Sequence, residues 1–216
     1  MKKLLAKELG RIAPETTSST IFGRYSMRFE LGGAENTDSR IRIEQATARA
    51  MAIYTHALHG ESVILLIEEW DSSWLKSGKD NHQLNLINVL DHQRLKRFEG
   101  PFDQTYYEQD QAGNKIERLE KDGLKCDLSL GRVQLPLESA SKIIRGIIAT
   151  EMGGVPYITQ RIYFYSPEKQ TGMLVYDDRG CDVWADDLDI LRPTYEKFND
   201  WILAYNRVEV EEMFGQ

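Results

Sequence analysis

Residues 157–184, YITQRIYFYSPEKQTGMLVYDDRGCDVW, determine the expected fold. Three short runs rich in β-branched and aromatic residues, at 157–165, 172–176 and 181–184, are separated by two turn segments. Pro167 marks the first turn, and Gly180 can supply the left-handed backbone conformation that closes the second. The stretch therefore predicts a meander of three strands.

Helical periodicity lies on both sides of this meander. Apolar residues recur at helical spacing over 139–152, over 189–206 and, nearer the start of the chain, over 41–58. Tyr195, Phe198 and Tyr205 share the apolar face of the 189–206 segment, so we expect all three to lie in the core.

The remaining segments predict further short elements. A docking helix is expected over 2–12, a polar linker over 15–20, a helix over 84–98, and strands over 21–31, 63–67, 105–109, 115–120 and 126–130, of which 63–67 is apolar enough to be buried on both faces. Hairpins mixed with helices favour an α+β fold, with a mostly antiparallel sheet and helices packed mainly on one face. We expect a single domain over 1–216, with a short helix and linker at 1–20 and the α+β core at 21–216.

Charge and composition exclude several classes of protein. The net charge of −7 and the pI near 5.2 argue against a nucleic-acid binder, which needs a basic face. Two cysteines are too few for a disulfide-stapled secreted domain. Lys7, Glu8 and Arg11 interrupt the only signal-like segment, and the 63–67 run is too short to cross a bilayer. We therefore expect a cytoplasmic protein that does not bind membranes.

Standard catalytic motifs are missing. The chain has no G-x-S-x-G elbow, no P-loop and no C-x-x-C pair. We expect no cofactor, and the question of enzymatic activity stays open but leans towards none.

The densest cluster of unusual residues is 176–182, which contains Asp177, Asp178, Asp182 and Arg179. The three carboxylates could converge on a hard cation such as Mg²⁺ or Ca²⁺. Alternatively, an aspartate caps the turn amides while Arg179 pairs with a neighbouring carboxylate and holds the turn. A third interpretation is an exposed edge that binds a protein.

This stretch resembles the signature of a bacterial family, domain of unknown function 3885. The resemblance continues at 199–202 and Tyr205, and near the start of the chain at 28–32 and 49–50. It covers most of the chain after about residue 20, and it implies no activity because none is established for the family. Cys181 stands where relatives are expected to have a larger apolar residue, so it is a poor candidate for shared catalytic chemistry.

Two hypotheses of function remain. The first is a non-enzymatic binding protein for a basic protein partner, toxin-neutralising or immunity-like in its sharpest form. It uses the Asp-rich turn together with Trp70 and Trp74, which we expect in an exposed loop. It would lose its basis if Asp178 and Asp182 were buried and fully paired.

The alternative is a metal-assisted hydrolase or small-ligand enzyme that uses Asp177, Asp178 and Asp182. Arg28 and Arg179 would then bind an anionic substrate group. Arg28 and Glu30 lie two residues apart on one face of the first expected strand, so they could also form a structural salt bridge.

Overall fold

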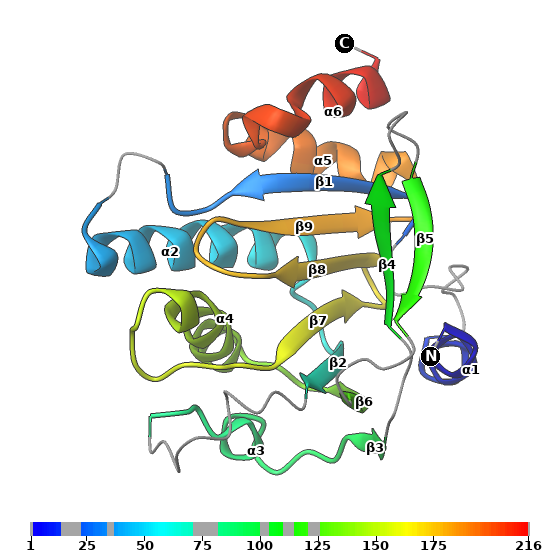
Figure 1. Cartoon of the computed structure of the whole chain (residues 1–216), viewed down its shortest axis with the longest axis vertical. Coiled ribbons are helices and arrows are strands. Elements are labelled where there is room, and N and C mark those ends of the chain that lie inside the picture. Colours follow the sequence, from blue (N-terminus) through cyan, green and yellow to red (C-terminus); the bar gives the residue numbers. More distant parts are fainter. Residues whose placement is uncertain are drawn as a thin grey trace.

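The computed structural model describes residues 2–13, 23–33, 37–70, 82–99, 104–109, 115–120 and 126–215, arranged as in Figure 1. The helices are α1 (Lys2–Ile12), α2 (Ser39–Ala57), α3 (Leu86–Val89), α4 (Leu137–Glu151), α5 (Leu188–Phe198) and α6 (Arg207–Phe214), with 3-10 turns η1 (Asn199–Trp201) and η2 (Ala204–Asn206). The strands are β1 (Tyr25–Glu30), β2 (Val63–Trp70), β3 (Lys96–Phe98), β4 (Gln104–Gln109), β5 (Lys115–Glu120), β6 (Cys126–Val133), β7 (Arg161–Ser166), β8 (Thr171–Val175) and β9 (Gly180–Ala185).

Seven of the strands form one sheet in the order β1-β9-β8-β7-β2-β6-β3, and all neighbours are antiparallel. The predicted meander is confirmed as β7, β8 and β9. The apolar run at 63–67 is confirmed as part of the central strand β2, between β7 and β6. Strands β4 and β5 pair as a separate hairpin, also as predicted. The fold is α+β.

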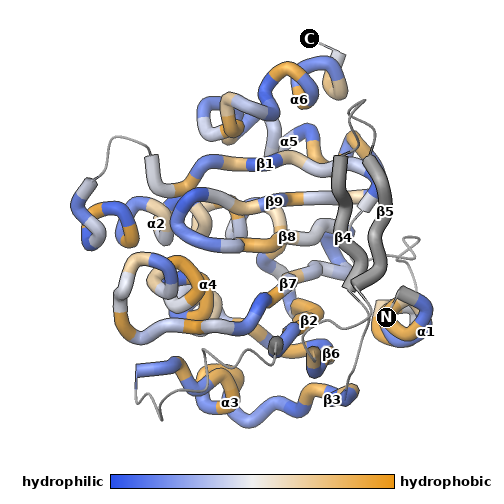
Figure 2. Tube along the Cα trace, viewed as in Figure 1, coloured by the Kyte–Doolittle hydropathy of each residue, from blue (hydrophilic) through white to orange (hydrophobic). Residues whose placement is uncertain are grey.

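The helices cover the two faces of the sheet unequally. Because side chains alternate along each strand, Phe29, Phe164 and Val183 point to one face, where they join α2, α4 and α5 in the larger apolar core. On the other face, α1 places Leu5 and Leu9 in a smaller apolar cluster. Figure 2 shows hydrophobic and hydrophilic residues interleaved along α1, α2 and α4, as amphipathic helices require.

The helix predicted over 84–98 is wrong. Only Leu86–Val89 is α-helical, because Asp91 and His92 adopt left-handed φ angles of 50° and 55° that end the helix. The chain then continues into β3, which pairs with β6. Gly131 on β6 permits this approach, since a Cβ there would lie 3.2 Å from the carbonyl oxygen of Arg94. Tertiary pairing has overridden the local periodicity.

The helix predicted over 189–206 is shorter than expected. Asp187 caps its start by accepting a hydrogen bond of 3.0 Å from the amide of Asp189. The α-helix ends at Phe198, and two 3-10 turns lead into α6, which was not predicted.

Candidate functional site

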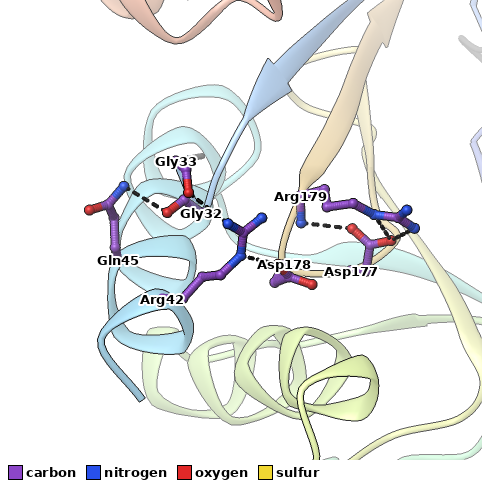
Figure 3. A network of polar contacts seen from close by, with 7 residues as sticks. All are labelled: Gly32, Gly33, Arg42, Gln45, Asp177, Asp178 and Arg179. Carbon is purple, nitrogen blue, oxygen red and sulfur yellow. Dashed lines mark hydrogen bonds and ion pairs between the residues drawn. The ribbon is translucent and has the colours of Figure 1, made fainter. Parts of the chain in front are cut away.

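The turn between β8 and β9 is held together by its own charges. The Asp177 carboxylate accepts hydrogen bonds from the Arg179 amide at 2.7 Å and from Arg179 Nε at 2.8 Å, and it pairs with the guanidinium Nη2 as well (Figure 3). The structural alternative for Asp177 and Arg179 is thus confirmed: the aspartate caps the turn and the arginine pairs with it.

The neighbouring Asp178 ties this turn to helix α2. Its carboxylate pairs with Arg42 Nε, and Arg42 Nη1 also donates to the Gly33 carbonyl at 2.6 Å (Figure 3). Gln45, one turn further along α2, donates to the Gly32 carbonyl at 3.1 Å. Gly32 lies so close to the turn that a Cβ would stand 2.7 Å from the Asp178 carbonyl oxygen. We call Arg42, Gln45, Asp178 and the carbonyls of Gly32 and Gly33 the clasp. The clasp joins α2, the segment after β1 and the β8–β9 turn.

The interpretation of Asp177 and Asp178 as part of an exposed binding edge is wrong. Asp177 and Asp178 are only 3% and 5% exposed. Desolvating a carboxylate is unfavourable unless it is paired, which explains why each one faces an arginine. Both side chains are therefore committed to the fold and are not available to a partner.

Asp182 lies on the opposite face of the sheet, next to Arg28. Asp182 and Arg28 are register partners on β9 and β1, and Arg28 Nε donates to Asp182 Oδ1 at 2.9 Å. This hydrogen bond raises the pKa of the Arg28 guanidinium. The guanidinium also lies 5.5 Å from the centre of the Tyr176 ring, a cation–π contact. Unlike the clasp, this pair reaches solvent, with 44% of the Arg28 side chain exposed.

Tyr205 follows two residues after a segment that is hydrogen-bonded to Arg28. The chain following η1 runs along the free edge of β1, where Leu203 N donates to the Arg28 carbonyl at 3.0 Å and Ile202 forms a bridge to Phe29. Tyr205 is consequently close enough to Arg28 to contribute to its pKa, and it is 89% exposed. The prediction that Tyr205 lies in the core is wrong, because the 3-10 turns after Phe198 break the helical phase on which it rested.

We call the group Arg28, Tyr176, Asp182 and Tyr205 the Arg28–Tyr205 patch. Its members come from β1, from the residue after β8, from β9 and from η2. Sequence reasoning singled out Arg28 and Asp182 but assigned Tyr205 to the interior. The family resemblance included Tyr205, but helical periodicity alone also accounted for it and favoured the interior.

The other candidate residues do not join this patch as expected. Glu30 does not pair with Arg28 in the described contacts; its carbonyl accepts from Arg49 Nη1 at 3.4 Å. Trp70 is the last residue of β2 and not part of a loop, and Trp74 lies outside the described residues. Cys181 is fully buried on the core side of β9, and burial raises the pKa of its thiol well above the ordinary value.

The three carboxylates proposed to converge on a metal do not converge. Asp177, Asp178 and Asp182 each face a different arginine. Across the part of the chain that the structure describes, no group of three or more His, Cys, Asp or Glu side chains could hold a metal ion. Among the same residues, no helix combines the length and apolar character needed to cross a bilayer.

Acidic side chains dominate the segment that follows β9. We call residues 186–214, which comprise α5, η1, η2 and α6 with their flanking residues, the C-terminal layer. It contains eight Asp or Glu and three Lys or Arg side chains, a net charge of −5. In Figure 1 it lies along the β1 edge of the sheet, and Tyr205 belongs to it.

The protein has an antiparallel α+β fold. Of the acidic residues in the 176–182 motif, Asp178 lies in the buried clasp and Asp182 in the surface patch. The chain belongs to the family described as Domain of unknown function (DUF3885), whose model matches residues 5–206. It is also 38% identical over 55 residues to the uncharacterized protein YnaE of Bacillus subtilis (strain 168), a match that covers 26% of this chain and 26% of YnaE. No solved structure matches the chain.

Proposed function

We propose that this protein is a non-catalytic binding module that engages a basic protein partner through its C-terminal layer, with the Arg28–Tyr205 patch as the anchor. The observation that carries the proposal is the 89% exposure of Tyr205, two residues after the backbone hydrogen bond from Leu203 to Arg28. So exposed a tyrosine side chain contributes little to the stability of the fold, because its ring buries almost no area.

The chemistry of the patch suits a protein interface. Tyrosine and arginine are enriched among the residues that carry most of the binding energy in interfaces. Asp182 and the Tyr176 ring already hold the Arg28 guanidinium in place. A partner that contacts Arg28 therefore has less side-chain entropy to remove, which favours affinity.

The charge of the surrounding layer favours a basic partner. Exposed carboxylates such as Asp189, whose side chain is 85% exposed, raise the rate of encounter with positively charged proteins at low salt. Neutralisation of a basic toxin would be the sharpest form of this function. The metal-assisted hydrolase has less support, since Asp177 and Asp178 are each committed to an arginine.

The test is affinity capture from a lysate of the native host with three tagged baits: the wild type, Tyr205→Ala and Ile87→Ala. Ile87 is the matched control, because it is 64% exposed but lies on α3, away from the C-terminal layer. We expect wild type and Ile87→Ala to retain the same basic protein, and Tyr205→Ala to retain at least tenfold less.

The retained protein should then be purified and titrated against each variant at two salt concentrations. A Kd that weakens at least tenfold in Tyr205→Ala, and also weakens as salt rises, supports the proposal. Equal binding by wild type and Tyr205→Ala would overturn it, as would a partner whose binding does not respond to salt.

A further inference from the structure

A basic surface lies at the other end of the sheet. Helix α1 contains four Lys or Arg and one Glu, and residues 94–98 contain three Lys or Arg and no acidic residue. Together they have a net charge of +6 in a chain whose total is −7. Asp127 on the neighbouring strand β6 pairs with Arg97 at 2.6 Å and offsets one of these charges. We call α1 and residues 94–98 the basic edge.

Contacts between α1 and β3 make the basic edge one continuous surface. Leu5, Leu9 and Ala13 turn the apolar side of α1 towards the sheet. Glu8 Oε2 pairs with Lys96 Nζ on β3 at 2.9 Å, which fixes the helix beside that strand. Lys3 and Lys7, one turn apart on the outer side of α1, are exposed.

The basic edge and the C-terminal layer lie at opposite ends of the molecule. β3 and β1 are the two edge strands of the seven-stranded sheet. In the basic edge, β3 is the edge strand, while α1 packs on the sheet face over β2 and β6 and is paired with β3 through Glu8 and Lys96. The C-terminal layer follows β1, to which Leu203 is hydrogen-bonded. Figure 1 shows β3 at the bottom of the view, α1 at its right-hand side below the middle, and the C-terminal layer at the top. Each molecule therefore presents a positive region that includes one edge strand and a negative region along the other edge strand.

From this arrangement we infer that the protein associates head to tail, with the basic edge of one copy docked on the C-terminal layer of the next. Two like surfaces repel, so a symmetric dimer through either one is disfavoured, whereas unlike surfaces attract. A head-to-tail contact leaves one surface of each kind free, and chains of molecules can grow unless the rotation closes a ring. The inference rests on the proposed function in that it uses the same acidic layer.

The association is expected to be weak and sensitive to salt. Exposed ion pairs contribute only about 0–1 kcal/mol each, so several must act together. A basic partner would compete with the basic edge for the C-terminal layer and would disperse the chains. Self-association and partner binding are therefore mutually exclusive, and binding of the partner would dissociate the chains of molecules.

The test uses purified full-length protein and two charge-reversed variants. Lys3→Glu with Lys7→Glu changes the basic edge only, and acidic residues near the start of a helix are tolerated well. Glu209→Lys with Glu212→Lys changes exposed positions of the C-terminal layer only. Circular dichroism confirms that both variants fold, and sedimentation equilibrium then gives the mass of each sample.

We expect wild type to exceed the monomer mass of 24.9 kDa at ~0.01 M salt and to return to it at ~1 M salt, as the Debye length falls from about 30 to about 3 Å. Each variant alone should be monomeric at both salt concentrations. Their equimolar mixture should exceed the monomer mass again, because the unchanged C-terminal layer of the first variant meets the unchanged basic edge of the second.

A monomeric wild type at low salt would overturn the inference, as would variants that associate as wild type does. A mixture that stays monomeric would contradict the assigned surfaces. None of these results depends on a partner from a lysate. A failure of self-association would therefore leave the proposed function untouched, because the capture experiment on Tyr205 tests it independently.

Discussion

The charged residues of the clasp act at the level of single side chains. Asp178 is 5% exposed, and its carboxylate pairs with Arg42 across 136 residues of sequence. Such a pair adds little net stability over an apolar pair, but removing one member leaves the other charge buried without compensation. The clasp is therefore a place where one substitution has a large effect.

We predict that Asp178→Ala lowers the free energy of unfolding by about 3–5 kcal/mol, because the partly buried Arg42 guanidinium loses its counter-charge. Urea denaturation followed by circular dichroism measures the change. Glu44→Ala is the matched control, since its pair with Arg40 is exposed on both sides and is worth roughly 0–1 kcal/mol. Equal effects of the two substitutions would show that the clasp is not a buried pair in solution.

His56 is expected to make stability depend on pH. Partial burial and then the nearby Lys197 ammonium lower its pKa below 6.5, with a smaller contribution from Lys169, while a hydrogen bond to the Pro193 carbonyl opposes the shift. Lys197 Nζ lies 3.4 Å from His56 Nδ1, so the folded state favours the neutral ring. Below pH ~6.5 the unfolded chain binds the proton more readily, and stability falls as pH decreases towards the folded pKa.

The prediction for His56 is tested by thermal melts between pH ~7 and pH ~5. His56→Gln keeps a polar side chain but has no proton to gain, so its Tm should fall less over this range than the Tm of the wild type. Parallel curves for the two proteins would mean that His56 titrates alike in the folded and unfolded states.

Two glycines, on β8 and β9, leave room for aromatic rings to pack against the strand backbone. A Cβ on Gly172 of β8 would come within 2.1 Å of the Trp184 ring on β9, and a Cβ on Gly180 of β9 would come within 2.4 Å of the Tyr176 hydroxyl. The rings therefore lie against bare backbone. Trp184 is thereby buried to 1% exposure, and Tyr176 is placed next to Arg28.

We predict opposite effects for alanine at two glycines. Gly172→Ala should destabilise the protein by about 1–3 kcal/mol because the indole must move. Gly10→Ala, in α1, should stabilise it by about 0.5–1 kcal/mol, because a Cβ at that position meets nothing within 4 Å and alanine is the better helix former. Chemical denaturation of both variants measures the difference, and a neutral Gly172→Ala would contradict the packing of Trp184.

For the whole molecule, α1 is the element that covers the second face of the sheet. Leu5 and Leu9 contribute to the same apolar cluster as Leu66, Leu128 and Leu130 of the sheet. Without these contacts, buried apolar surface on β2 and β6 would meet water. Stability of the whole fold is thus linked to a short helix at the beginning of the chain.

Leu5→Ala is predicted to cost about 2–5 kcal/mol and to increase binding of a hydrophobic dye such as ANS. Leu137→Ala is the control, because Leu137 is 39% exposed and its truncation leaves a smaller cavity. If the two variants have the same Tm and the same dye fluorescence, α1 does not cover this face in solution.

The local parts of the fold could be predicted from the sequence alone. The meander, the helices near 41–58 and 139–152 and the central strand at 63–67 follow from periodicity and turn residues within short windows. Arg179 and Asp177 are two residues apart, so their pairing was also readable from the chain. The failed helix at 84–98 shows the limit, since pairing of β3 with β6 decided that segment.

The roles of the site residues were decided only by the tertiary structure. Asp178 and Asp182 lie in one short motif. Asp178, in the turn before β9, pairs with Arg42 in the buried clasp, whereas Asp182, on β9, pairs with Arg28 at the surface. Those arginines are 136 and 154 residues away in sequence. Residue type and spacing set the local backbone. Which distant charge meets which carboxylate, and whether water reaches them, depends on how strands and helices pack.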